Sequence, residues 1–142
     1  MFQIGKTGIG YLLSLAKLGH INNGTFSDHV CGGVFGATAY ADPVVYVPCV
    51  DGLRAVTIGP GASFRVKWSG PAGEPGPPIV GDGSVWYLDS SSGEGQLVGL
   101  SPATGKANFR VTVGSMVHFA SPAAGDGLIL VAAGGRIEAL GA

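Results

Sequence analysis

The chain has 142 residues and a formal net charge of −1, with 46% hydrophobic and only 12% charged residues. Glycine occupies 26 positions. This composition disfavours a coiled coil, a disordered tail and a helical bundle, and it favours one turn-rich all-β domain. The sequence has no basic patch suited to nucleic acid, and no apolar run reaches the roughly 18 residues of a membrane span.

Residues 1–33 are predicted to form a partial unit followed by a loop. Phe2 and Ile4 alternate with polar residues, a polar glycine-bounded turn follows, and residues 11–15 complete a predicted β-hairpin. Residues 16–33 predict a loop with a short helical turn at its start.

Residues 34–69 are predicted to form the first complete unit, with four short extended segments separated by Gly, Pro and Asp turns. The predicted strands are residues 34–40, 44–50, 53–58 and 63–68. Residues 44–50 are almost continuously apolar, which is typical of a strand buried on both faces. A linker, residues 70–76, leads to the next unit.

Residues 76–114 are predicted to form a second unit of four strands, and residues 118–142 a third unit that stops before a fourth strand. The second unit has strands at residues 77–80, 85–89, 96–100 and 108–113. In the third unit, His118 and Phe119 begin a first strand, and residues 128–132 and 136–140 form two more.

Short motifs recur at a regular offset. Phe64-Arg65-Val66 returns 45 residues later at residues 109–111, and Gly81-Asp82-Gly83 returns 44 residues later at residues 125–127. Four strands within a period of this length are the signature of β-propeller blades. The expected strand count is two or three, then four, four and three, which amounts to about three and a half blades in a single segment.

Cys31 and Cys49 are the two cysteines. An even pair in a chain with few charges fits a disulfide in an oxidising compartment, and two buried thiols are the alternative. A zinc site using His29 with both cysteines is disfavoured, because no Cys-x-x-Cys motif or second histidine pair accompanies them.

The segment from Ile79 to Asp89, IVGDGSVWYLD, together with QLVGLSPATGK at residues 96–106, resembles the repeat of pyrroloquinoline-quinone (PQQ)-like propellers. Thr104-Gly105-Lys106 matches the tight turn of that repeat, whereas Ser101 replaces its usual aspartate. Trp68 ends a fourth strand where the family carries a blade-docking tryptophan, and by the motif offset Val113 takes that position in the second unit.

The resemblance implies the carboxy-terminal part of a larger secreted bacterial propeller, located outside the cell or in the periplasm. No signal peptide is expected in this chain, because residues 8–19 contain a lysine and glycines and lack a cleavage site. The family's rings have seven or eight blades, so we expect a partial propeller or a share of an oligomeric ring. A homodimer through open blade edges is one form of that assembly.

The function expected from the resemblance is a non-catalytic binding or scaffold module for a protein or a small ligand. Phe35, His118 and Phe119 are the candidate binding surface at the axial end of the first strands. We assign no catalytic, cofactor-binding or metal residues. Trp86 is expected to pack between blades, and Asp89 to serve a strand end, although it is the carboxylate that most merits inspection for function.

Two alternatives remain open at this point. The first is a PQQ-dependent oxidoreductase, or the remnant of one, which would bind PQQ with calcium. The vicinal disulfide common in such enzymes is absent, since Cys31 and Cys49 are not adjacent. The second alternative is a structural protein that assembles through its open edges. The identity of the ligand or partner is not encoded in any motif of the chain.

Overall fold

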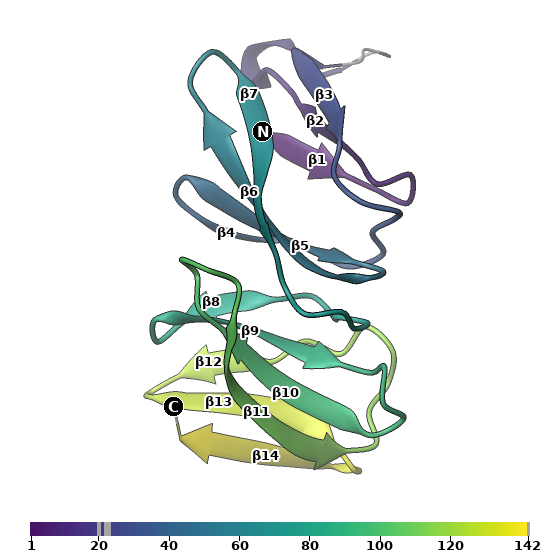
Figure 1. Ribbon diagram of the computed structural model, residues 1–142, viewed down its shortest axis with the longest axis vertical. Coiled ribbons are helices and arrows are strands. Elements are labelled where there is room, and N and C mark those ends of the chain that lie inside the picture. The colour runs from purple at the N-terminus through teal and green to yellow at the C-terminus, as the bar shows by residue number, and fades with distance from the viewer. Residues whose placement is uncertain (20, 22–23, 142) are drawn as a thin grey trace.

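The computed structural model describes residues 1–19, 21 and 24–141, and this part of the chain is all-β. It contains 14 strands and one 3₁₀ turn, η1 (Leu15–Lys17). The strands form four antiparallel sheets of three, four, four and three strands, as predicted. Figure 1 shows the sheets stacked in chain order as an open array. No helix within the described residues is long and apolar enough to cross a bilayer.

The sheets are built from neighbouring strands along the chain. The first contains β1 (Phe2–Ile4), β2 (Ile9–Leu12) and β3 (Phe26–His29). The second contains β4 (Ala39–Ala41), β5 (Val44–Cys49), β6 (Gly52–Gly59) and β7 (Ser63–Ser69). The third contains β8 (Ile79–Gly81), β9 (Ser84–Asp89), β10 (Gly95–Leu100) and β11 (Ala107–Gly114). The fourth contains β12 (Ala123–Gly125), β13 (Leu128–Ala133) and β14 (Arg136–Gly141).

Three predicted boundaries were wrong. Strand β3 lies inside the predicted loop of residues 16–33, of which residues 20 and 22–23 fall outside the described part. The predicted strand at residues 34–40 shrinks to β4, because Gly36 packs between Pro48 and Pro77 and leaves the sheet. His118 precedes the fourth sheet in a turn instead of starting its first strand.

Three separate hydrophobic cores hold the stack together, one between each pair of neighbouring sheets. All residues of β5 and of β9 are buried, as predicted for strands covered on both faces. Successive side chains of a strand point to opposite faces. Thus Tyr87 packs toward the second sheet and Trp86 toward the fourth. Packing between sheets is therefore the role of Trp86, as expected.

Matching turns set these faces in register from one sheet to the next. The turn between β8 and β9 has positive φ at Asp82 (53°) and Gly83 (72°), and the turn between β12 and β13 has 51° at Asp126 and 73° at Gly127. Positive φ at both central residues defines the tight hairpin turn whose twist suits antiparallel strands. Since the two turns have the same form, each position of β13 has a structural counterpart in β9.

Strand pairing corrects the repeat alignment suggested by the recurring Phe-Arg-Val motif. Trp68 pairs with Ala55, and Phe109 pairs with Gly99. Both partners lie opposite an aromatic residue of the second strand, Tyr46 and Trp86, in the corresponding register. The counterpart of Trp68 is therefore Phe109, and the assignment of Val113 was wrong. A register shift follows Ala55 and Gly99 in the same place, so identical letters 45 residues apart do not occupy the same position.

Trp68 joins the second sheet to the third. Its indole nitrogen donates a hydrogen bond to the carbonyl oxygen of Pro102 at 3.0 Å. A Cβ on Gly105 would lie 2.5 Å from the Trp68 ring, and φ at Gly105 is +71°. The turn after β10 thus needs glycine for both space and backbone shape. First strands also meet, since β4 contacts β8 and β8 contacts β12, so the sheets converge at one edge.

Candidate functional site

The linkers between sheets run past the ends of the second strands, and the same hydrogen bond fixes all three. The backbone N–H of Val50 donates to Gly33, that of Ser90 to Glu74 and that of Gly134 to Ser115, at 3.1, 3.3 and 2.6 Å. The three carbonyl groups belong to residues 33, 74 and 115, which are evenly spaced. Corresponding points of three units are thereby brought to one end of the stack.

The linkers also pack on one another. A Cβ on Gly36 would lie 3.1 Å from the Pro77 ring, and one on Gly76 would lie 2.3 Å from the Ala120 carbonyl oxygen. The Ser121 hydroxyl donates to the Pro77 carbonyl at 3.1 Å. Residues 30–38, 70–78 and 115–122 therefore form a continuous surface.

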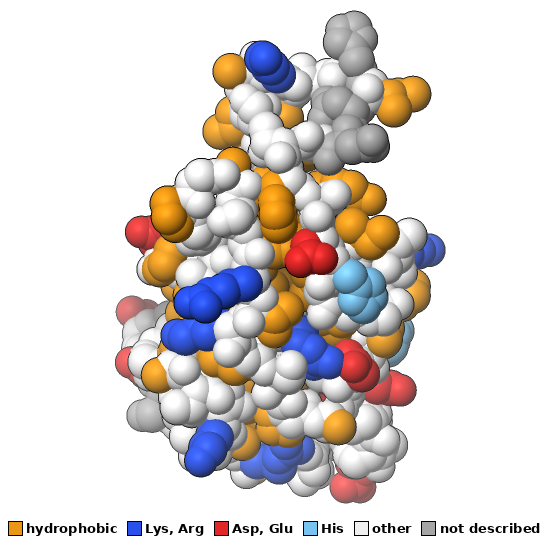
Figure 2. Space-filling model, turned by 45° about the horizontal axis from the view of Figure 1, so that its top comes forward, with side chains coloured by type: hydrophobic (Ala, Val, Ile, Leu, Met, Phe, Trp, Pro, Cys, Tyr) orange, Lys and Arg blue, Asp and Glu red, His pale blue; other side chains and the backbone are white. Residues whose placement is uncertain are grey.

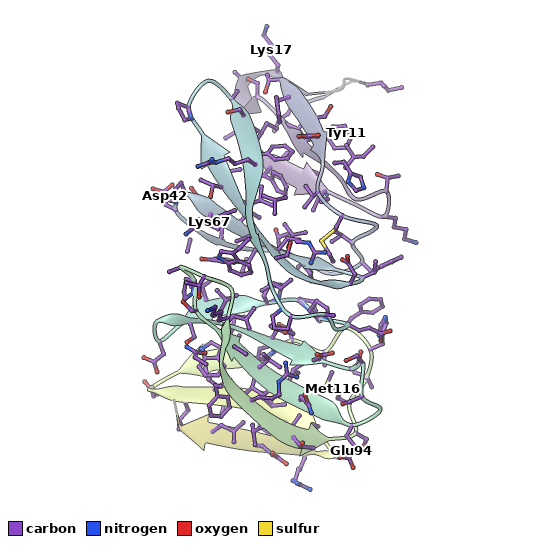
Figure 3. The ribbon with its side chains drawn as sticks, viewed as in Figure 1. Tyr11, Lys17, Asp42, Lys67, Glu94 and Met116 are labelled. Atoms are coloured by element: carbon purple, nitrogen blue, oxygen red, sulfur yellow. A yellow bond between two sulfur atoms is a disulfide. The ribbon has the colours of Figure 1, made fainter. Side chains whose placement is uncertain are left out.

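A disulfide between Cys31 and Cys49 anchors the first linker to the end of β5 (Figure 3). This confirms the predicted pairing and corrects the alternative of two buried thiols. The zinc alternative is wrong as well, because both sulfur atoms are bonded to each other and are not thiolate ligands. Within the described residues, no group of three or more His, Cys, Asp or Glu side chains is placed to hold a metal ion.

Asp89 occupies in the third sheet the strand-end position that Cys49 occupies in the second. Its carboxylate accepts hydrogen bonds from the backbone N–H groups of Glu74 and Ser91, each at 3.0 Å. The Arg110 guanidinium lies 3.8 Å from the other carboxylate oxygen. Asp89 is buried and anchors the second linker, which is the strand-end role expected from the sequence.

A cleft of about 200 Å³ opens where the linkers meet. The three residues predicted as a binding surface, Phe35, His118 and Phe119, all line it. Phe35 is 53% exposed and Phe119 is 49% exposed. Sequence reasoning missed the other lining side chains, which are Pro48, Cys49, Val50, Glu74, Pro75, Ser90 and Met116. The regular spacing of the linker residues 33, 74 and 115 is the signal that would have found them.

The aromatic wall of the cleft is held in an uncommon conformation. Phe119 has a φ of 67°, which is rare for a bulky side chain. Its ring lies 4.0 Å from the His118 ring, centroid to centroid, at an interplanar angle of 56°. Such backbone outliers persist only where surrounding contacts hold them, and they gather at binding sites. Here the hydrogen bond from Ala120 to Val117 closes the turn that presents both rings.

The chemistry of the cleft is mainly apolar, with few polar groups. The Glu74 carboxylate lies 3.4 Å from the Ser90 hydroxyl, and the Lys6 ammonium lies 5.6 Å from the centroid of the Phe35 ring. Figure 2 shows Lys, Arg, Asp and Glu side chains scattered among hydrophobic and uncharged ones, without a broad patch of one sign on that face. The cleft is suited to an apolar or aromatic group with one hydrogen-bonding or cationic feature.

Comparison with models of protein families gives no match for this chain, and comparison with curated proteins gives none either.

Proposed function

We propose that the chain is a non-catalytic binding module outside the cytoplasm, and that its linker cleft holds an apolar or aromatic side chain of a partner protein. The observation that carries this proposal is the convergence of three corresponding linkers on one cleft with two half-exposed phenylalanines. Aromatic residues are enriched where proteins bind each other. We treat the four sheets as blades of a PQQ-like propeller, which their register and converging first strands support.

The size of the cleft favours a side chain over a whole cofactor. Sites for small molecules usually enclose roughly 300–1,000 Å³, whereas this cleft encloses about 200 Å³. An extended peptide can insert one ring or proline into such a space and leave its backbone outside. The disulfide supports the proposed location, because such bonds persist in oxidising compartments.

The proposal is tested by NMR titration of the ¹⁵N-labelled protein with indole, used as a probe for an aromatic side chain. We expect saturable shifts confined to amides of residues 33–36, 74–76 and 116–119. Phe35→Ala and Phe119→Ala should each weaken binding several-fold, since each removes one aromatic wall. Tyr40→Ala is the matched control, because Tyr40 is an exposed aromatic outside the cleft.

Shifts spread over the surface, or equal effects of the three substitutions, would count against a binding role for this cleft.

A further inference from the structure

The outer edge of β14 is open. In the two central sheets, the third strands β6 and β10 are covered by fourth strands, β7 and β11. Within the described residues, no strand pairs with the corresponding side of β14, which ends the stack at the bottom of Figure 1. An unpaired strand edge presents a row of backbone donors and acceptors to any extended chain.

Strand pairing shows what the open edge leaves uncovered. Ala132 in β13 corresponds to Leu88 in β9, counting from the matching turns. Ala132 pairs with Ile137, and Leu88 pairs with Leu97. Ile137 is therefore the counterpart of Leu97, yet Ile137 is 76% exposed whereas Leu97 is completely buried.

The whole outward face of this sheet is apolar and exposed. Residues opposite one another in antiparallel strands share a face. The face therefore consists of Ala123, Gly125, Leu128, Leu130, Ala132, Ile137, Ala139 and Gly141. Leu130 is 37% exposed, whereas its counterpart Trp86 is 4% exposed.

One position on this face specifies what would cover it. In the central sheets, a small third-strand residue lies opposite an aromatic fourth-strand residue, as Ala55 does opposite Trp68 and Gly99 opposite Phe109. Each aromatic ring also contacts the second strand, with Trp86 and Phe109 centroids 5.3 Å apart. The counterpart in β14 is Ala139, which pairs with Leu130. The fourth sheet thus keeps the small residue with no aromatic ring above it in the described chain.

We propose that β14 accepts an extended segment of a partner protein as an added antiparallel strand, with an aromatic residue opposite Ala139. Backbone hydrogen bonds along β14 supply the affinity, and the space over Ala139 and Leu130 selects the aromatic side chain. Alternate residues of the incoming strand are β-branched, as in β11, where Val111 and Val113 follow Phe109 on the same face. This surface is separate from the linker cleft.

The test uses a synthetic peptide of residues 107–114, the β11 sequence, added to the ¹⁵N-labelled 142-residue protein. We expect shifts and slower hydrogen exchange at β14 amides that do not bond to β13. A peptide with Phe109→Ala should bind at least tenfold more weakly, and a scrambled peptide should not bind.

Two protein variants test the aromatic position. Ala139→Val fills the space opposite the incoming ring and should weaken binding at least fivefold. Ala123→Val is the matched control, because Ala123 flanks Leu130 on the side of β12. It should change binding less than twofold. Circular dichroism melting curves verify that both variants fold.

Three results would overturn the proposal: no binding at 1 mM peptide, equal binding of the scrambled peptide, or equal effects of the two valine variants. A fourth is a dimer in sedimentation that Ala139→Val dissociates, because the occupant would then be a second copy of this chain.

Discussion

Replacing Tyr87 by phenylalanine should stabilise the protein. Tyr87 is completely buried between the second and third sheets. Its hydroxyl is the buried side-chain oxygen that lacks a hydrogen-bond partner within the described chain. An unsatisfied buried hydroxyl costs about 1–3 kcal/mol, so Tyr87→Phe should raise the free energy of unfolding by about 1 kcal/mol or more at pH 7.

Alkaline pH should enlarge this difference. Burial, with a further contribution from Asp89 and against the opposing effect of Arg110, raises the Tyr87 pKa from 10.0 to about 12. The stability that the neutral hydroxyl supports is complete below pH 10 and is lost as the pH rises through 12, because the unfolded chain ionises first. The advantage of the variant should therefore grow by about 1.4 kcal/mol per pH unit across that window.

Urea denaturation at pH 7, 10 and 11.5 measures both effects. Tyr40→Phe is the control, because the exposed Tyr40 hydroxyl donates to the Asp42 carboxylate and its loss should not stabilise the protein. If Tyr87→Phe lowered stability by more than about 1 kcal/mol, the hydroxyl would be satisfied, for example by a buried water, and the reasoning would be refuted.

Three further predictions concern the covalent link, a turn and the cofactor. Removing the disulfide by Cys31→Ala with Cys49→Ala should cost about 3 kcal/mol in urea denaturation, as expected for closing a loop with a sequence separation of 18; unchanged stability would show that the linker is held without it. Gly105→Ala should cost about 3 kcal/mol, because strain from positive φ and the clash with Trp68 add, whereas Gly83→Ala has the strain alone and should cost about 1 kcal/mol; equal losses would argue against the Trp68 contact. After incubation with PQQ and calcium, gel filtration should leave no cofactor absorbance with the protein, and retained PQQ would revive the oxidoreductase alternative.

The strands of the two central sheets were predictable because turn residues bound each apolar run. The spacing of Gly81-Asp82-Gly83 and its recurrence also located the matched hairpins correctly. Strand β3 escaped prediction because Ser27, Asp28 and His29 are polar and exposed, and the strand forms through pairing with β2. Tertiary pairing overrides local propensity in such a segment.

The candidate site was predictable only in part. Phe35, His118 and Phe119 were grouped by their expected place in the repeat, and the structure brings them to one cleft. Glu74 and Met116 were missed, because no local motif marks the packing of one linker on another. The repeat alignment failed at Trp68 because a bulge shifts the register, and a bulge of one residue leaves no clear trace in the sequence.

The shared register of the four sheets has a consequence for how such chains change during evolution. Each core is formed only by two neighbouring sheets, and each joint uses the same type of turn, pairing and linker bond. A tandem duplication of the β8–β11 segment would introduce a sheet whose two faces already suit the neighbours it meets. The array can therefore gain or lose members through single genetic events, without a new core having to arise by successive point substitutions.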